Sequence, residues 1–300
     1  MSSLPLDSSA AKAPSLAADD VPFVPPRFRF LRKHPTLIAG TLLLVAVAAL
    51  SIGAPWIATH DPQDMDVLAR MQPPSAEHWF GTDALGRDVF SRAVWGGQVS
   101  MIVGLSVGIL ATVLGVLLGL FAGFVRWADG FVMRVMDGLM AIPGILLAIA
   151  LMAVTRASLT TVIVAITIPE IPRVVRLVRS LSLTLREQLY VEAAHAVGTR
   201  LPVILARHVL PNMVAPLIVQ ATFVAAAAVL TEAALSFLGV GVPAQTPSWG
   251  NMMAEGRNFV AVAFHIILYP GLLLAATVLA INLLGDGLRD ALDPRLARQL

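Results

Sequence analysis

Residues 190–198 read Tyr-Val-Glu-Ala-Ala-His-Ala-Val-Gly, and residues 208–212 read His-Val-Leu-Pro-Asn. This polar stretch lies between two long apolar runs. An apolar side chain recurs at every fourth position from residue 185, which predicts one apolar stripe on a short amphipathic helix. The stripe consists of Leu185, Leu189, Ala193 and Val197. Gly198 suits the position after a helix end, where a positive φ is needed. The pattern predicts a surface helix over residues 185–198 that ends in a sharp turn.

The surface of this helix is expected to be free for another protein. Ala193 and Ala194 give it a small surface, which favours insertion into a groove on a partner. Glu192 has no cationic neighbour at helical spacing apart from His195, which is mostly neutral. Its carboxylate is therefore available to a backbone amide or to an arginine of a partner.

The composition is typical of an integral membrane protein. Hydrophobic residues make up 57% of the 300 residues, charged residues only 13%, and the mean hydropathy is +0.79. The charged fraction of a soluble domain is about a quarter. Long apolar runs, instead of short alternating strands, favour helices over a barrel. The sequence predicts an all-α membrane protein.

The sequence also excludes several kinds of chemistry. It contains no cysteine, which excludes disulfides, thiolate metal sites and thiol catalysis. Neither Lys12 nor Lys33 follows a glycine-rich loop, so the phosphate-binding pattern Gly-x-x-x-x-Gly-Lys is absent. The six histidines show no ligand spacing, and no metal site is expected. We expect no cofactor on this chain, and any ATP must bind to another chain.

The opening stretch resembles a known signature. Residues 192–194 read Glu-Ala-Ala, Gly198 follows after three residues, and Leu210-Pro211 lies further on. This pattern is similar to the signature loop of the membrane subunits of bacterial ATP-binding-cassette importers. The resemblance implies contact with the ATPase by Glu192, Ala193, Ala194, Gly198, Leu210 and Pro211. His208 departs from the broad family, which usually has an aliphatic residue there, but resembles the peptide and nickel branch. A loop helix packed on its own bundle is the alternative.

A second motif lies at residues 81–88, which read Gly-Thr-Asp-Ala-Leu-Gly-Arg-Asp. The glycines favour turns, and Asp88 is expected to cap the following helix. The string resembles the Gly-Thr-Asp-x-x-Gly-Arg-Asp motif of one permease type in peptide importers, the type with an extra N-terminal segment. Residues 235–239, 246–250 and 282–294 match the same branch, so the resemblance covers most of residues 35–295.

Six apolar runs predict transmembrane helices. They lie at residues 36–58, 99–125, 139–154, 157–168, 213–234 and 259–284, and the fourth is either a short helix or a bent helix that continues through residue 178. Residues 126–134 are expected to form a turn, and Pro143 to kink the third span. Glycines four residues apart on the second span predict a packing face. These are Gly104, Gly108, Gly115, Gly119 and Gly123.

The expected organisation has four parts. Residues 1–26 form a disordered cytoplasmic tail, because they have few large apolar side chains. Residues 27–96 contain the first span and an extracytoplasmic linker, residues 97–290 form a core of five helices, and residues 291–300 form a second cytoplasmic tail. A cleaved signal peptide is the alternative for the first span, but its apolar run exceeds the usual core of about 7–15 residues.

Basic residues predict the orientation. With the N-terminus in the cytoplasm, sixteen of the 21 lysines and arginines lie on the cytoplasmic side. Outside remain Arg70, Arg87, Arg92, Arg156 and Arg257. The same orientation puts residues 185–198 in the cytoplasm, where an ATPase would be.

Two other functions compete with transport driven by ATP. Residues 104–108 fit the pattern Gly-x-Ser-x-Gly, and an intramembrane serine protease would pair Ser106 with a histidine such as His265. Ser106, however, lies inside a predicted span. An ion-coupled secondary transporter would need acidic groups in the membrane, for which Glu170 and Glu232 are candidates. That reading leaves the docking helix unexplained, and the chain shows no repeated halves.

The resemblance therefore implies an all-α membrane protein with six transmembrane helices, the type I ABC importer (MetI-like) permease fold, and both termini in the cytoplasm of a bacterium. It implies a permease subunit of the inner membrane that imports di- or oligopeptides by alternating access, with nickel, glutathione or another small solute left open. The implied partners are a second, different permease, two cytoplasmic ATP-binding subunits, an extracytoplasmic solute-binding protein and membrane lipid, with no nucleic acid. Glu170 and Glu232 are candidates for the translocation pathway.

Overall fold

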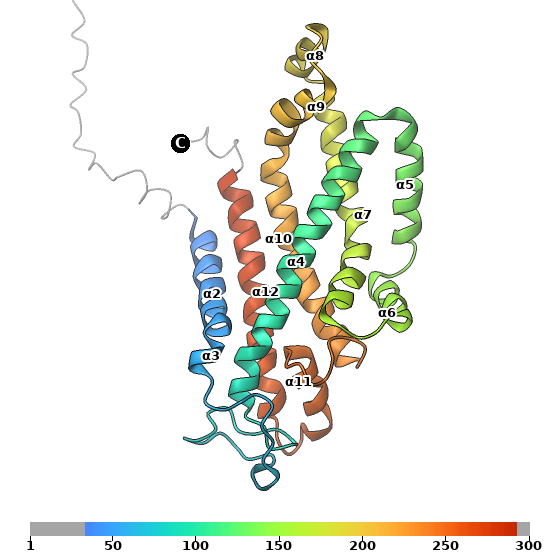
Figure 1. Cartoon of the computed structure of the whole chain (residues 1–300). Helices are drawn as coiled ribbons and strands as arrows, with labels where there is room; N and C mark the ends of the chain where they lie inside the picture. Colours follow the sequence, from blue (N-terminus) through green and yellow to red (C-terminus); the bar gives the residue numbers. More distant parts are fainter. Residues whose placement is uncertain (1–33, 293–300) are drawn as a thin grey trace, which may run out of the picture. The chain divides into compact units, whose positions relative to one another are not determined.

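The computed structural model describes residues 34–292, so the predicted tail at residues 1–26 lies outside the described residues, as do residues 27–33 and 293–300. Within residues 34–292 no strand forms, apart from one isolated bridge between Thr82 and Asp88. The all-α prediction is confirmed (Figure 1). The α-helices are α2 (Pro35–Ile52), α3 (Ala54–Ile57), α4 (Val89–Phe124), α5 (Arg126–Met140), α6 (Gly144–Val154), α7 (Leu159–Arg186), α8 (Leu189–Ala196), α9 (Leu201–Ile204), α10 (Leu210–Phe237), α11 (Trp249–Gly256) and α12 (His265–Leu292).

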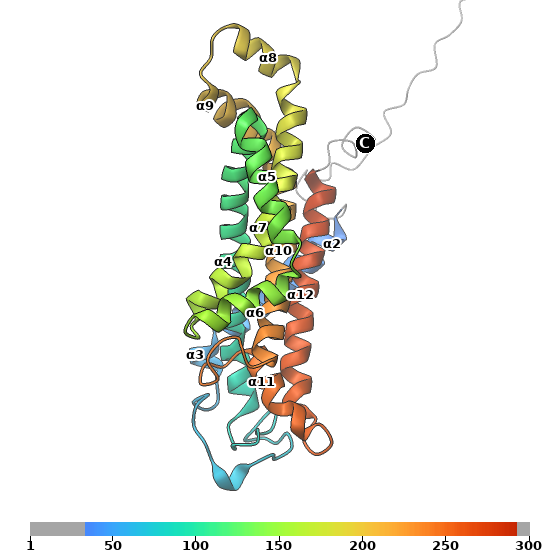
Figure 2. The same cartoon turned by 90° about the vertical axis from the view of Figure 1, so that its right-hand side faces the viewer.

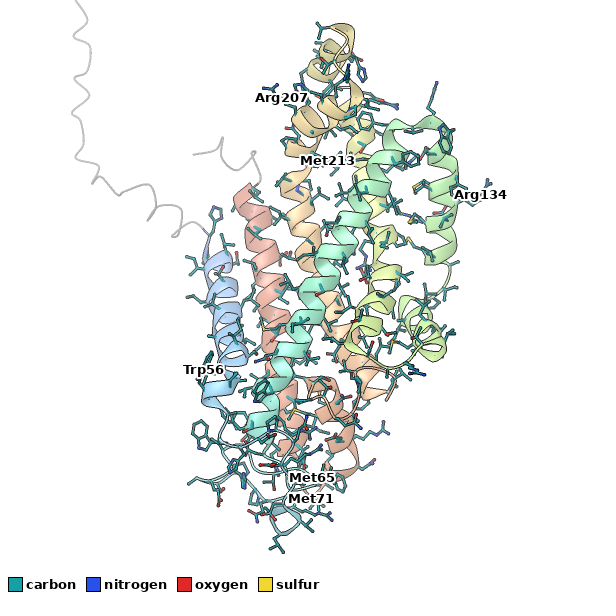
Figure 3. All side chains as sticks on the ribbon, viewed as in Figure 1. Trp56, Met65, Met71, Arg134, Arg207 and Met213 are labelled. Carbon is teal, nitrogen blue, oxygen red and sulfur yellow. The ribbon has the colours of Figure 1, made fainter. Side chains whose placement is uncertain are left out.

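The long helices of this part run side by side and give it two ends (Figures 1 and 2). Helix α8 projects at one end, which we call the α8 end. Residues 59–88 and α11 lie at the other, which we call the distal end. Met65 and Met71 belong to the distal end, whereas Arg207 lies beside α8 (Figure 3). Helix α2 begins and helix α12 ends toward the α8 end (Figure 1).

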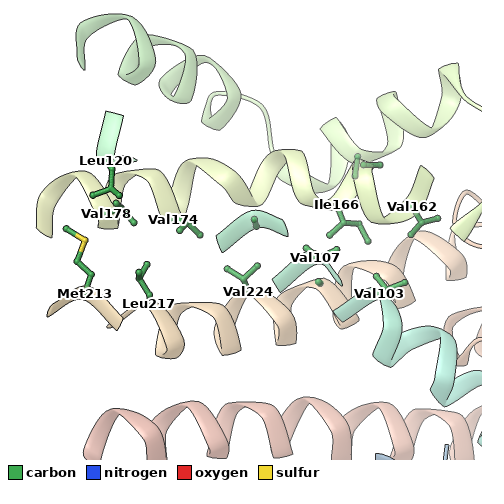
Figure 4. Close-up of a cluster of buried hydrophobic side chains, with 14 of the residues drawn as sticks. Val103, Val107, Leu120, Val162, Ile166, Val174, Val178, Met213, Leu217 and Val224 are labelled. Atoms are coloured by element: carbon green, nitrogen blue, oxygen red, sulfur yellow. The ribbon is translucent and has the colours of Figure 1, made fainter. Parts of the chain in front are cut away.

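The main core forms where α4, α7 and α10 meet. Val103 and Val107 of α4, Val174 of α7 and Val224 of α10 are all completely buried (Figure 4). Helix α2 packs on α12, and α12 packs on α10. A helix that faces a bilayer needs no polar outer face. Apolar residues therefore occur on all sides of α4 and α10, and many are exposed on the outside of the described part.

The glycine strip of α4 is a packing face, as predicted. Gly104 and Gly108 lie against Val229 and Ala225 of α10. Further along α4, the other three glycines lie against α7. They are Gly115, Gly119 and Gly123, which face Val174, Val178 and Ser182. A β-carbon added at Gly119 would lie 2.6 Å from Cβ of Val178, so only glycine permits this approach. One helix thus packs tightly on two others by using different halves of one strip.

The third predicted span differs from the expectation. Residues 126–134 belong to helix α5, not to a turn, and α5 is followed by α6 at an angle of 88°. Pro143 stands immediately before α6, as its N-terminal cap residue. Proline lacks the N–H that a continuing helix requires, and it disfavours the helical conformation of the residue before it. The chain therefore breaks sharply where we expected a kink.

Four helices in the described residues are long and apolar enough to cross a membrane, namely α2, α4, the continuous run Leu201–Phe237, and α12. The bent pair α5 and α6 is a fifth candidate. The fourth predicted span corresponds to α7, which does not end at Ile168 but continues through Pro169 and Pro172 to Arg186. Its second half carries Arg173, Arg176 and Arg179, which keep it outside this group of apolar helices. A crossing by α7, and hence a count of six, stays a prediction.

Candidate functional site

Helix α8 ends as the sequence predicts. Gly198 has a φ of +79°, and its N–H donates to the carbonyl of His195 at 2.9 Å, while the N–H of Thr199 donates to that of Ala194 at 3.0 Å. These two bonds form a Schellman motif, in which the residue after the helix adopts the left-handed conformation. Glycine adopts it without steric cost. The chain can therefore turn back toward α9 immediately after α8.

The start of α8 and its buried face differ from the prediction. The chain breaks at Gln188, whose ψ of 137° is extended, so Leu185 belongs to α7 and the helix begins only at Leu189. The buried face consists of Val191 and Ala194, which join the main core. Leu185 packs against the same core, whereas the rest of the predicted apolar stripe points the other way, since Leu189 and Val197 are 82% and 80% exposed. The stripe is thus available to another molecule.

The remaining residues of the predicted coupling site lie on α8 and at the start of α10. Glu192 and Ala193 are exposed on α8. Leu210 is half-buried against the core and Pro211 is exposed, at the start of α10. The rings of Tyr190 and His208 lie 6.3 Å apart between their centroids, which joins α8 to the turn before α10. That turn, Leu205–Val209, is π-helical. The α8 end therefore brings the two halves of the opening motif together.

At the distal end, the second motif forms an ion-pair network. The Nε of Arg87 donates to Asp83 at 2.7 Å, and Arg92 also donates to Asp83. Both arginines donate to Glu255 of α11, at 2.5 and 2.6 Å. The side chains of Arg92 and Asp83 are 2% exposed, so the charges are paired inside the protein. Sequence reasoning had no signal for Glu255, which lies more than 160 residues away along the chain.

Glu170 stays near the surface of α7. Its carboxylate accepts a hydrogen bond from Arg173 at 3.1 Å, and its side chain is 14% exposed. Pro169 and Pro172 on either side do not end the helix. Glu170 and Arg173 therefore form an ion pair within one continuous helix.

Glu232 is completely buried between α4 and α10. It accepts hydrogen bonds from Ser100 of α4 at 2.9 Å and from Ser236, one turn further along α10, at 2.8 Å. Burial of a carboxylate is costly unless it is hydrogen-bonded, and these two hydroxyls satisfy it. Glu170 and Glu232 belong to different environments and do not form one site.

The fold does not assemble a serine protease centre. Nε2 of His265 lies 3.0 Å from the carbonyl of Thr82, at the distal end. Ser106 lies in the middle of α4, about 25 Å along the helix from Val89, at 1.5 Å per residue. The two side chains are therefore not within reach of each other.

These features define a class of protein, namely a helical membrane protein with a short helix that projects beyond its spans. Residues 111–298 match the family of binding-protein-dependent transport system inner membrane components. Residues 27–74 match the N-terminal transmembrane domain of oligopeptide transport permease C. The chain belongs to the family of binding-protein-dependent transport system inner membrane components.

Named relatives cover nearly the whole chain. A probable peptide ABC transporter permease protein of Sinorhizobium fredii, y4tQ, is 53% identical over 90% of this chain and 93% of its own length. A glutathione transport system permease protein of Salmonella typhimurium, GsiD, is 44% identical over 89% of both chains. The dipeptide transport system permease protein DppC of Alkalihalophilus pseudofirmus is 42% identical over 90% of this chain and 89% of the relative.

One solved structure shares the fold. It is described as inward facing conformations of the MetNI methionine ABC transporter, and it matches with a TM-score of 0.57 and 21% identity over 67% of this chain and 97% of the other. The predicted type I importer fold is thereby confirmed. The chain is a permease subunit of an ABC importer in the inner membrane and is not an enzyme, since ATP is hydrolysed on partner chains. ATP-binding subunits and a substrate-binding protein complete such a system.

Proposed function

We propose that this permease pairs with a second, different permease subunit to import small peptides, and that one of the two ATP-binding subunits of the assembly docks on α8 from the cytoplasm. The observation that carries the docking proposal is the exposed stripe of α8. Leu189 and Val197 are large, apolar and at least 80% exposed on the helix that projects at the α8 end. Apolar side chains grouped in this way mark a contact with another protein.

The proposed mechanism runs from α8 into the long helices. Helix α8 lies between α7 and the run that leads into α10, and its buried side chain Val191 belongs to the core that both helices share. A movement of the docked ATP-binding subunits would therefore displace α7 and α10 together. Such a displacement supports alternating access, in which the pathway opens first to one side and then to the other.

The peptide cargo is supported by three relatives. Their names refer to a peptide, a dipeptide and glutathione. Glutathione is itself a small peptide, so the shared chemistry is a short chain of amides with charged ends. The experiment is competition for uptake of a labelled dipeptide, with unlabelled tripeptides, glutathione and Ni²⁺ as competitors. We expect competition by peptides; competition by Ni²⁺ alone would contradict the peptide cargo.

The docking proposal is tested with two substitutions on the α8 end. Gly198→Pro is incompatible with the observed φ of +79°, and Glu192→Lys reverses the exposed charge. We expect each to lower transport at least tenfold while ATP hydrolysis continues and membrane insertion stays normal. Gly198→Asn is the matched control, because asparagine tolerates the left-handed conformation. Normal transport in both test variants would disprove docking at this helix.

For the pathway we propose Glu170, whose partly exposed carboxylate is suited to the cationic amino terminus of a peptide. Glu170→Gln keeps the shape of the side chain and removes the charge. We expect it to reduce uptake of peptides with a free amino terminus and to leave blocked peptides unaffected. If the variant and the parent, at normal expression, took up free and blocked peptides equally well, Glu170 would have no role in the pathway and would serve only as the ion-pair partner of Arg173.

A further inference from the structure

We propose that His60 and His78, with Asp88 as the carboxylate that orients them, form a binding site for one divalent transition-metal ion, of the Zn²⁺ class, at the distal end. One ligand-capable atom of each residue lies within 4.8 Å of the others. The three residues line a cavity of about 350 Å³ together with Asp64, Asp66 and Glu77. Sequence spacing gave no indication of this site, because the two histidines come from separate parts of the segment between α3 and α4.

The hydrogen bonds of the cluster determine which ring nitrogens carry protons. Nδ1 of His78 lies 3.0 Å from Oδ1 of Asp88. An ionised carboxylate only accepts, so this nitrogen is the donor. In neutral His78 the other nitrogen, Nε2, then has a free lone pair. A histidine held by a carboxylate in this way is the usual arrangement of a metal ligand.

The same carboxylate orients His60 through Thr59. The hydroxyl of Thr59 donates to Oδ2 of Asp88 at 3.2 Å. Because that hydroxyl has one proton, it acts as acceptor toward Nδ1 of His60, which lies 3.0 Å away. Neutral His60 therefore also has its lone pair on Nε2. One buried carboxylate prepares both imidazoles to bind a cation.

The chemistry of the donors favours Zn²⁺, or a similar ion, over Ca²⁺ and Mg²⁺. Imidazole nitrogen suits zinc, copper and nickel, whereas the alkaline-earth ions take oxygen ligands. The ring centroids of His60 and His78 are 4.7 Å apart. Ligands of a tetrahedral zinc ion lie about 3.4 Å apart, given bonds of about 2.0–2.1 Å. A rotation of the two rings toward each other would bring one nitrogen of each to this separation.

Asp88 is anchored independently of any ion. Its side chain is 0% exposed, and it accepts the N–H of Ser91 at 2.7 Å, which caps α4. An ion held by both imidazoles would tie residue 60 to residue 78, which is itself bonded to the cap residue Asp88 of α4. It would therefore stabilise the distal segment, a role separate from transport.

The test uses the full-length chain, purified without a polyhistidine tag, with Co²⁺ as a spectroscopic probe and Zn²⁺ as competitor. We expect one equivalent of Co²⁺ that Zn²⁺ displaces, and a rise in the unfolding temperature with Zn²⁺. Replacing even an outer partner of a metal ligand weakens affinity about 10- to 100-fold, so His60→Gln and His78→Gln should each weaken Co²⁺ binding at least tenfold.

The matched control is His195→Gln, which removes an exposed histidine at the α8 end. It should bind Co²⁺ as the parent does. The proposal is overturned if the parent binds no more Co²⁺ than His60→Gln does, or if the control loses the same binding. His60 caps no helix, so its replacement should not unfold the chain. If metal-free His60→Gln has the unfolding temperature of the metal-free parent, a loss of Co²⁺ binding is not caused by misfolding.

Discussion

At the scale of single residues, the distal ion-pair network explains why the second motif contains two arginines. Asp83 is shared by Arg87 and Arg92, and Glu255 accepts from the same pair. Two guanidinium groups and two carboxylates thus pair with one another in a largely buried position. The motif connects the segment before α4 to α11, and its positive residues are structural in this setting.

This network predicts the effect of losing one partner. Asp83→Ala would leave two nearly buried guanidinium groups with one carboxylate, and breaking a buried pair costs about 3–5 kcal/mol. We expect a marked fall in the unfolding temperature of the purified chain. Asp61→Ala, at an exposed carboxylate of the same segment, is the control and should change stability by less than about 0.5 kcal/mol. Equal unfolding temperatures of the two variants would contradict a stabilising network.

Glu232 illustrates what residue-level sequence reasoning missed. An acidic residue in an apolar run indicates function by default, which is why it was a pathway candidate. In the structure its carboxylate accepts hydrogen bonds from Ser100 and Ser236, and its role in the pathway stays a prediction. Ser100 belongs to a helix more than a hundred residues earlier, so no local pattern could reveal it. The two histidines of the metal proposal were also missed, because no local pattern relates residue 60 to residue 78.

At the scale of elements, tight contacts of α4 depend on glycine. We predict that Gly119→Leu destabilises the chain by about 1–3 kcal/mol or more, because the added side chain must displace Val178 of α7. Gly138→Ala on α5 is the control, since nothing lies within 4 Å of an added β-carbon there. That change should be neutral or stabilising by up to about 1 kcal/mol.

The measurement is the unfolding temperature of each variant, with the yield of folded chain as a second readout. Unchanged stability of Gly119→Leu would mean that α4 and α7 are not held at the observed distance. If Gly138→Ala also lowered the unfolding temperature, the difference between the two variants could not be attributed to packing between α4 and α7.

The elements differ in how well the sequence predicted them. The apolar length of α2, α4, α10 and α12 was read correctly, as were the cap at Asp88 and the turn at Gly198, because each depends on local chemistry. The boundaries of these helices were not predicted correctly. Helix α4 begins ten residues before its apolar run, since Asp88 and the ion pairs, not hydropathy, determine its start. The prediction of a turn at residues 126–134 missed a helical pattern, because Ala128, Val132 and Met136 recur at every fourth position and form the buried face of α5.

At the scale of the whole molecule, the orientation in the membrane is the remaining prediction. The distribution of basic residues in the sequence predicts that the α8 end is cytoplasmic, and α2 begins and α12 ends toward that end (Figure 1). Reporter fusions after Pro26, near Val197 and at Leu300 should therefore read cytoplasmic. Fusions near Gln72 and Asn251, both at the distal end, should read extracytoplasmic. A reversed reading near Val197 would remove α8 from the ATP-binding subunits.

The continuous run Leu201–Phe237, described above as one apolar helix, also has a mechanical meaning. At 1.5 Å per residue this rod is about 55 Å long. It begins beside α8 and holds Glu232 close to its far end. A rod of this length that pivots at its base by about 5° moves its tip by about 5 Å, nearly one helical turn. The protein can thus amplify a slight push on a surface helix into a stroke wide enough to open or shut a passage for a small molecule.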